Sequence, residues 1–235
     1  GDEEDYDRSS NLTTNYQFFC DMVLKEEIPV ADLYAAVGKL EIISITLDQG
    51  DNAQLIFESL NSTGLALTEG DKIRNYVLMG LPAQNQSKYY DTYWAKIERC
   101  TGNDVSGFIR DYLSIKEQII PSINTVYRAF KDYAEKASLP TDTLLADLLR
   151  YARFYEKLLI CKSGLKEQKL DDCLYRLKRL EIVVTRPFLM EVLRLNQDGK
   201  LTSKDVLQIF LITENYLFRR NICEVPTNAL NKIFL

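Results

Sequence analysis

Along most of the chain, apolar residues recur at intervals of three and four positions, the spacing that places them on one face of an α-helix. The stretches are separated by glycine, proline and short polar runs, which end or cap helices. The pattern predicts helices over residues 12–28, 30–37, 69–80, 88–99, 104–119, 122–136, 141–161, 166–194 with a break at Pro187, and 202–219. We therefore expect a mainly α fold, a multi-helix bundle or array.

One segment departs from the helical pattern. Residues 40–47 are rich in β-branched side chains and lead into the turn sequence Asp48-Gln49-Gly50. A strand needs a neighbour to be stable, and its partner would lie outside this chain or in a short element that the pattern does not mark. We expect at most one short strand or a small sheet remnant near residues 40–47.

A joint between two parts of the chain is expected at Thr101-Gly102-Asn103, its clearest polar, glycine-containing linker. The first part is mixed in pattern and the second is helical throughout, so we expect two domains, residues 1–101 and 102–235. No fixed repeat period occurs, which disfavours a solenoid of identical repeats.

Charge and hydropathy narrow the classes of function. With 29 Lys and Arg against 34 Asp and Glu the net charge is -5, so any contact with DNA must be local. The chain has no apolar run of about 18 residues and no basic leader, which disfavours membrane insertion and secretion. The expected location is cytoplasmic. Because Gly1 stands in place of an initiator methionine, we expect an excised segment of a longer protein.

The absence of histidine removes catalytic triads, zincins and HNH-type nucleases, which all use imidazole as base or ligand. The five cysteines form no Cys-x-x-Cys pair, which favours reduced, buried thiols over a disulfide framework or a zinc site. Adjacent carboxylates such as Asp171 and Asp172 point to different faces of a helix. We therefore assign no catalytic residue and no metal ligand to this chain.

The most informative stretch is residues 55–76, Leu-Ile-Phe-Glu-Ser-Leu-Asn-Ser-Thr-Gly-Leu-Ala-Leu-Thr-Glu-Gly-Asp-Lys-Ile-Arg-Asn-Tyr. Asp51 or Asn52 caps a helix that runs to Leu60, and Thr68-Glu69-Gly70-Asp71 is a capping box that opens the next one. The stretch resembles the hallmark F-E-x-L-N-x-T-G-x-x-L-x-x-x-D-x-x-R-N of domain of unknown function 262, the ParB/sulfiredoxin-like domain of GmrSD-type restriction proteins. Every letter of that hallmark is present.

A second resemblance lies at the other end of the chain. Residues 214–223 (Glu-Asn-Tyr-Leu-Phe-Arg-Arg-Asn-Ile-Cys) and 227–232 (Thr-Asn-Ala-Leu-Asn-Lys) are similar to the helical connector that precedes an HNH-type nuclease domain in these proteins. Together the two motifs bracket residues 10 to 235.

Membership of this family implies a nucleotide-dependent defence protein that senses or cuts foreign DNA, with a D-G-Q-Q-R motif in its nucleotide-binding domain. That motif and the nuclease histidines are absent here. The resemblance therefore implies a middle fragment whose partners are the rest of the parent chain and, through it, DNA. A nucleoside triphosphate and a divalent metal would belong to the full-length parent, and no activity is carried over to the fragment.

Two interpretations of the hallmark remain open. Its polar loop, Asn61, Ser62, Thr63 and Gly64, is suited to hydrogen-bond phosphate or ribose. The N-terminus of the following helix favours anions, and Lys72, Arg74 and Asn75 lie within it. In the alternative, the same residues only end one helix and cap the next. Asp71 fits the alternative well, because a carboxylate repels phosphate.

Two further groups carry a functional and a structural interpretation. Arg219 and Arg220 could clamp DNA phosphates, but such pairs more often complement a helix C-terminus. The aromatic cluster at 89–94 could stack on bases, but its spacing better fits a buried helix face.

The function expected from these features is that of a coupling core in a GmrSD-like restriction protein, which transmits a signal rather than catalyses. The rival is a stand-alone helical module that binds a protein partner through an apolar groove, with no nucleotide or DNA role.

Overall fold

The computed structural model describes residues 11–25, 27–42, 44, 46, 67–79, 81–226 and 229–234. They belong to two compact units, Gly1–Asp51 and Asn52–Leu235, which are described separately. All regular structure among the described residues is helical, so the expected mainly α fold is confirmed. None of the described helices combines the length and hydropathy that a membrane-spanning helix needs.

The first unit contains two helices, α1 (Asn11–Leu24) and α2 (Val30–Val37). The prediction for 30–37 is confirmed, whereas the helix expected over 12–28 ends at Leu24, four residues early. Most apolar side chains of both helices are exposed. In the segment 40–47, the described residues (40–42, 44 and 46) form neither helix nor strand, so no strand is found there. The helix expected to end at Leu60 lies outside the described residues.

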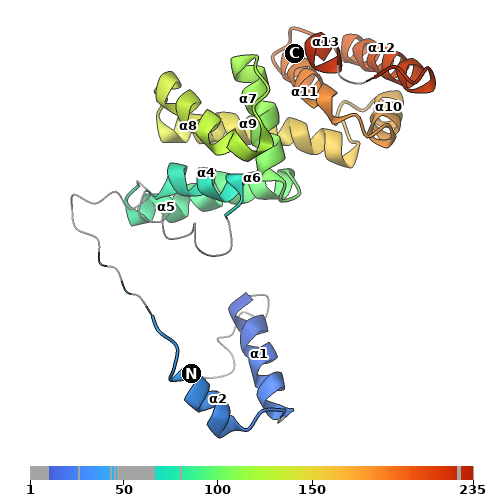
Figure 1. The fold of residues 1–235 in the computed structure, drawn as a ribbon. Helices are drawn as coiled ribbons and strands as arrows, with labels where there is room; N and C mark the ends of the chain where they lie inside the picture. The colour runs from blue at the N-terminus through green and yellow to red at the C-terminus, as the bar shows by residue number, and fades with distance from the viewer. Residues whose placement is uncertain are drawn as a thin grey trace. The chain divides into compact units, whose positions relative to one another are not determined.

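The second unit is an array of helices (Figure 1). Its first part consists of α4 (Glu69–Leu78), α5 (Ala83–Tyr89), the π-helix η2 (Tyr90–Trp94) and α6 (Ala95–Cys100). Its middle part consists of α7 (Val105–Glu117), η3 (Ile123–Thr125), α8 (Val126–Ala137) and α9 (Thr141–Ile160). Its last part consists of α10 (Gln168–Arg179), η4 (Val183–Thr185), α11 (Arg186–Gln197), α12 (Ser203–Ile222) and α13 (Leu230–Phe234).

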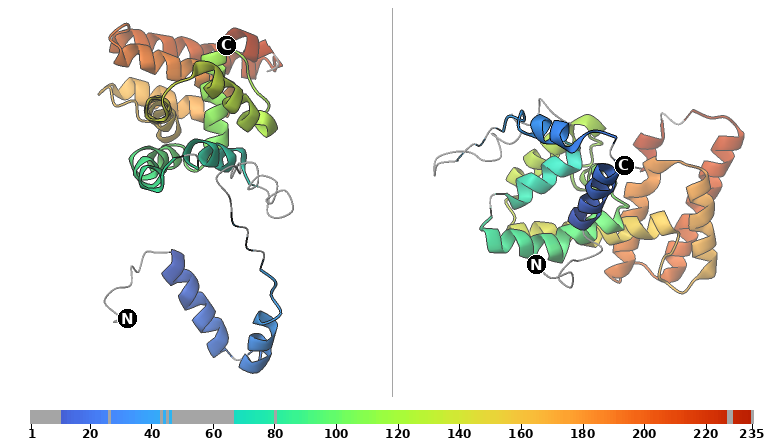
Figure 2. Two further views of the ribbon diagram at one scale, coloured as in Figure 1. Left: turned by 90° about the vertical axis from the view of Figure 1, so that its left-hand side faces the viewer. Right: turned by 90° about the horizontal axis from the view of Figure 1, so that it is seen from below.

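Helix α9 ties these parts together. It packs against α6 and η2 on one side of the array and against α11 and α10 on the other. Helix α11 in turn contacts α7 and α12, and Figure 2 shows α10 to α13 gathered at one end. Helices from both sides of residue 101 share this packing, since α4 lies against α7 and α8. The assignment of separate functions to 1–101 and 102–235 stays a prediction.

The core is rich in large aromatic side chains. Trp94, Phe108, Tyr112, Phe130 and Tyr155 are almost completely buried, and burial of such side chains is the main favourable term in folding. Rings meet edge to face, as between Phe108 and Tyr155, whose centroids lie 5.6 Å apart. The aromatic cluster of 89–94 belongs to this packing, because Trp94 is 1% exposed and Tyr89 and Tyr93 pack against the core. Core packing is therefore confirmed for Tyr89, Tyr93 and Trp94, whereas Tyr90 is 37% exposed.

The predicted break at Pro187 is wrong. Helix α10 ends at Arg179, the backbone turns at Glu181 with φ +54°, and Pro187 lies in the first turn of α11. The reason is that the first turn of a helix does not use its N–H groups, so proline is tolerated there. The left-handed residue, not the proline, separates the two helices.

The cysteines are free, as expected, but only some are buried. Cys161 and Cys173 are buried, Cys20 and Cys100 are partly exposed, and Cys223 is exposed. Among the described residues, no group of acidic or sulfur side chains is placed to hold a metal ion.

Candidate functional site

Helix α4 begins at Thr68, which forms a ring of hydrogen bonds with Asp71. The Asp71 N–H donates to Thr68 Oγ1 over 3.1 Å, and the Thr68 N–H and hydroxyl donate to Asp71 Oδ2 over 3.2 and 2.7 Å. These bonds satisfy N–H groups that the start of a helix otherwise leaves without a partner. The predicted capping box is confirmed, and the Asp71 carboxylate is part of it.

The candidate nucleotide-binding residues fall into two groups. Asn61, Ser62, Thr63 and Gly64 lie outside the described residues. Lys72, Arg74 and Asn75 lie on α4, within its first seven residues.

Both cations of this second group are held by carboxylates of the protein. Lys72 Nζ lies 2.8 Å from Glu69 Oε1, and Arg74 lies 3.3 Å from Asp71 Oδ1 and 3.4 Å from Glu98 Oε1. Each keeps about a third of its side chain exposed, so an incoming anion would compete with these carboxylates. Asn75 differs, because its Nδ2 is buried and has no hydrogen-bond partner among the described residues. A buried amide group without a partner is costly to a fold.

Polar groups of α4 also bind three other helices. The Gly70 N–H donates to Ser106 Oγ of α7 over 2.9 Å. Glu69 Oε2 accepts from the Tyr127 N–H at the start of α8 over 2.8 Å. Together with the pair between Arg74 and Glu98 of α6, these bonds attach the first two turns of α4 to α6, α7 and α8.

Glu98 is the centre of this junction on α6. Its carboxylate accepts from Trp94 Nε1 over 2.9 Å and from the Tyr90 hydroxyl over 3.2 Å, in addition to the contact with Arg74. Burial, followed by the charge of Glu98, raises the pKa of Tyr90, so the phenol stays a donor at neutral pH. The sequence analysis did not single out Glu98. The only signal for it was its spacing of four residues from Trp94, which places both side chains on one helix face.

A hollow of about 200 Å³ lies at this junction. Its lining includes the carboxylates of Asp71 and Glu98 and the indole of Trp94, and its other lining residues are Thr68, Gly70, Asn103 and Val105. Two carboxylates in the wall make the hollow unfavourable for a phosphate group unless a cation or a donor intervenes. The described part of the site is therefore a polar junction between helices, in which the protein's own donors engage both carboxylates.

The two arginines proposed as weak DNA contacts have different environments. Arg220 donates to the Tyr216 hydroxyl over 3.1 Å and to the Pro226 carbonyl, and it thereby ties α12 to the turn that follows. Arg219 is exposed, and no ion pair or hydrogen bond engages it among the described residues. The structure thus does not bring the two side chains together as a clamp, and only Arg219 has a free guanidinium.

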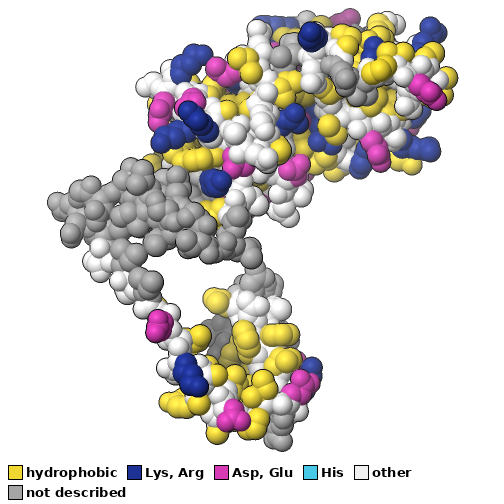
Figure 3. All heavy atoms as spheres, viewed as in Figure 1, with side chains coloured by type: hydrophobic (Ala, Val, Ile, Leu, Met, Phe, Trp, Pro, Cys, Tyr) yellow, Lys and Arg dark blue, Asp and Glu magenta, His cyan; other side chains and the backbone are white. Residues whose placement is uncertain are grey.

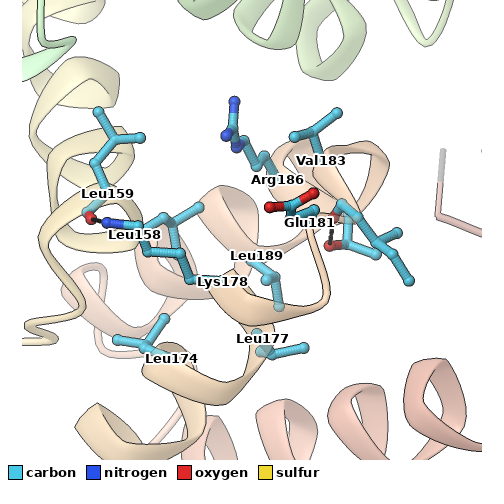
Figure 4. A pocket seen from close by; sticks show the side chains of 11 residues that line it. Leu158, Leu159, Leu174, Leu177, Lys178, Glu181, Val183, Arg186 and Leu189 are labelled. Atoms are coloured by element: carbon cyan, nitrogen blue, oxygen red, sulfur yellow. Dashed lines mark hydrogen bonds between the residues drawn. The ribbon is translucent and has the colours of Figure 1, made fainter.

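Figure 4 shows a second hollow, of about 80 Å³, between α9, α10, η4 and α11. Five of its eleven lining residues are leucines, and Lys178 Nζ donates to the Leu159 carbonyl over 2.8 Å. This bond caps the end of α9, where carbonyl groups have no partner within the helix. Helix capping therefore accounts for the polar contact of Lys178.

By class, the described residues of this unit form a helical body whose polar side chains join its elements. Comparison with protein-family models, with curated proteins and with solved structures finds no match for this chain. The resemblance of residues 55–76 to the GmrSD-type hallmark therefore rests on the sequence alone.

Proposed function

We propose that this chain is the non-catalytic coupling core of a GmrSD-like, nucleotide-dependent restriction protein. Residues 1–101 complete a nucleotide-binding domain, and the helices of residues 102–235 lead to a nuclease domain. The nucleotide-binding motif and the nuclease histidines belong to other parts of the parent protein.

The observation that carries this proposal is the triple attachment of α4. The helix opens directly after the hallmark loop 61–64, and its first residues bind Ser106 of α7, the Tyr127 N–H of α8 and Glu98 of α6. A packed element of this kind does not shift without rearranging its partners. A ligand that moved the start of α4 would therefore change the packing of three other helices.

Arg74 supplies the two alternative arrangements that coupling requires. Without a ligand it pairs with Asp71 and Glu98. A nucleotide phosphate beside the loop would draw the guanidinium away, because Arg binds phosphate strongly and in a bidentate manner. Glu98 would then keep only Trp94 and Tyr90 as donors, and the α4–α6 contact would weaken. Lys72, on the same turn, would add a second cation.

The experiment uses the full-length parent protein, and it measures nucleotide binding by calorimetry and nucleotide-dependent DNA cleavage. Asn61→Ala should weaken nucleotide binding about tenfold, as expected for loss of a hydrogen bond to a charged group. Ser106→Ala should leave binding unchanged and reduce the stimulation of cleavage by nucleotide. Ser122→Ala, a surface change on the η3 side of α8, is the control and should alter neither.

Two results would overturn the proposal. One is a parent protein whose upstream sequence lacks a D-G-Q-Q-R motif and which binds no nucleotide. The other is unchanged binding and hydrolysis in Asn61→Ala, which would leave the hallmark loop with a capping role only.

A further inference from the structure

The outer side of the last helices carries a groove with an unusual combination of side chains. A hollow of about 470 Å³ lies between α10 and α12 and is lined by Arg176, Arg179, Leu180, Glu214 and Phe218. The two helices run in the same direction here, since Arg176 pairs with Glu214 and Leu180 lies beside Phe218 further along both. The C-terminal ends of both helices therefore meet at one end of the groove.

The apolar part of the groove extends along α12. Phe218 is 53% exposed and Ile222 is 66% exposed, and Leu211 is also exposed. Their spacing of seven and four residues returns them to one side of the helix. From Leu211 to Ile222 this side measures about 16 Å, or three helical turns. Such a strip is longer than a small metabolite and matches the contact length of a partner helix.

The charges at the groove are not balanced within the protein. Glu214 accepts two hydrogen bonds from Arg176, over 2.9 Å for Nη2 to Oε2, so this pair bridges the helices and is internally neutral. Arg179 and Arg219, which are both exposed, have no carboxylate partner among the described residues. Lys and Arg side chains, together with Asp and Glu side chains, lie among hydrophobic ones over the part formed by the last helices (Figure 3). Among the residues that line the groove, Arg179 carries the charge that has no ion-pair partner in the described part of the chain.

We propose that the groove between α10 and α12 binds an acidic amphipathic helix of a partner protein. Its apolar side chains cover Leu180, Phe218 and Ile222, and its carboxylates pair with Arg179 and Arg219. Aromatic and arginine side chains are the residues that most often dominate the energy of such interfaces. The opposite charges fix the orientation of the helix and speed its encounter with the groove. This inference does not depend on the proposed nucleotide-coupled function.

The test uses the whole chain and a fluorescein-labelled designed peptide of about sixteen residues, long enough to span the three turns of the strip. The acidic peptide carries leucines at helical spacing with glutamates beside them. A second peptide has the same composition in an order that destroys the apolar face, and a third has lysine in place of glutamate. Fluorescence anisotropy should show saturable binding of the acidic peptide and at least about tenfold weaker binding of the other two.

Variants locate the binding on the protein. Phe218→Asp and Arg179→Glu should each lower the affinity for the acidic peptide about tenfold or more. Arg179→Glu should also improve the relative binding of the lysine peptide, which a loss of folding would not do. The matched controls are Ile123→Asp, 44% exposed on η3, and Arg128→Glu on α8, and both should change affinity less than about twofold.

Several outcomes would contradict the proposal. If the acidic peptide and its reordered version bind equally well, the groove is a non-specific apolar surface. If the control variants weaken binding as much as Phe218→Asp and Arg179→Glu do, the peptide binds elsewhere on the protein. If sedimentation shows a dimer that Phe218→Asp dissociates, the groove is an interface between two copies of this chain. If a labelled DNA oligonucleotide displaces the acidic peptide and depends equally on Arg179, the charge serves nucleic acid instead. The melting temperature of each variant shows whether a loss of binding is caused by unfolding instead of by one of these outcomes.

Discussion

A Cβ atom at residue 70 would lie 2.9 Å from the Cβ of Val105, so Gly70 is what allows the start of α4 to touch the start of α7. The Gly70 N–H donates to Ser106 Oγ at the same contact. The close approach and the hydrogen bond depend on each other, because a side chain at residue 70 would push the donor away from its acceptor.

Gly70→Ala tests this contact. Alanine favours helix by about 1 kcal/mol over glycine, but overpacking against Val105 should lower the free energy of unfolding by about 1–3 kcal/mol. Urea unfolding followed by circular dichroism measures the net change. Val105→Ala in the same background should restore part of the loss, and a double-mutant cycle with no coupling between the two positions would show that the approach is not tight.

Glu98 offers a second prediction, since it is the acceptor for the buried indole of Trp94. Glu98→Ala should cost about 1–3 kcal/mol of stability, because the Trp94 N–H would be buried without a partner. Glu98→Gln should cost less, because the amide oxygen can still accept. Trp94 is the only tryptophan of the chain, so its fluorescence reports on this site directly. Asp132→Ala, an exposed change on α8, should alter stability by less than about 0.5 kcal/mol.

Asp111 on α7 predicts a dependence of stability on pH. Burial raises the pKa of its carboxyl to about 7, and Asp104 adds to the rise, whereas Arg186 and Arg110 oppose it. In the unfolded chain the pKa is about 3.9. The folded state therefore binds the Asp111 proton more tightly than the unfolded chain does. Protonation of Asp111 contributes its full stabilisation below about pH 4, and this contribution is lost as the pH rises through about 7.

Asp111→Asn removes this proton equilibrium. The free energy of unfolding of the wild type should fall relative to that of the variant between pH 5 and pH 8. Chemical denaturation at a series of pH values measures the difference. Asp132→Asn serves as the control, and a difference that stays constant with pH for Asp111→Asn would refute the prediction.

Ser138 allows a prediction that involves no side-chain contact. It follows the last residue of α8 with φ +49°, a left-handed conformation that costs a residue with a Cβ about 1–2 kcal/mol. Ser138→Gly should therefore stabilise the protein by about 0.5–1 kcal/mol, measured by thermal unfolding. Ser122, whose φ is −65°, is the matched control, and Ser122→Gly should not stabilise.

Most helices of the second unit could be predicted because each has one apolar face and a local start signal. Thr141–Ile160 agrees with the predicted 141–161, and the capping box at Thr68 was visible as Thr-x-x-Asp. The predicted ends of α7, α8 and α9 agree with the structure to within two residues. The conformation at these ends was not predictable, because Gln118, Ser138 and Cys161 adopt left-handed conformations without being glycine.

The candidate site was predictable only in part. The sequence located α4 and its cap, and it placed Lys72 and Arg74 there. It could not indicate Ser106, Tyr127 or Glu98 as their neighbours, because these residues lie 24 to 58 positions away in the chain. Distances of that kind are set by packing between helices and leave no local pattern.

The sequence alone determined that this chain is mainly helical, where most of its helices begin, and that its 235 residues include no histidine. These properties follow from side-chain periodicity, capping and chemical type, which are local. Only the tertiary structure decided which polar side chains form hydrogen bonds or ion pairs between helices and which stay exposed to solvent. It engaged Arg74 and Arg220, placed Arg179 in the lining of the groove between α10 and α12, and left Arg219 exposed. The physical reason is that a charged side chain acquires its role from its neighbours in space, and helix packing alone brings those neighbours together.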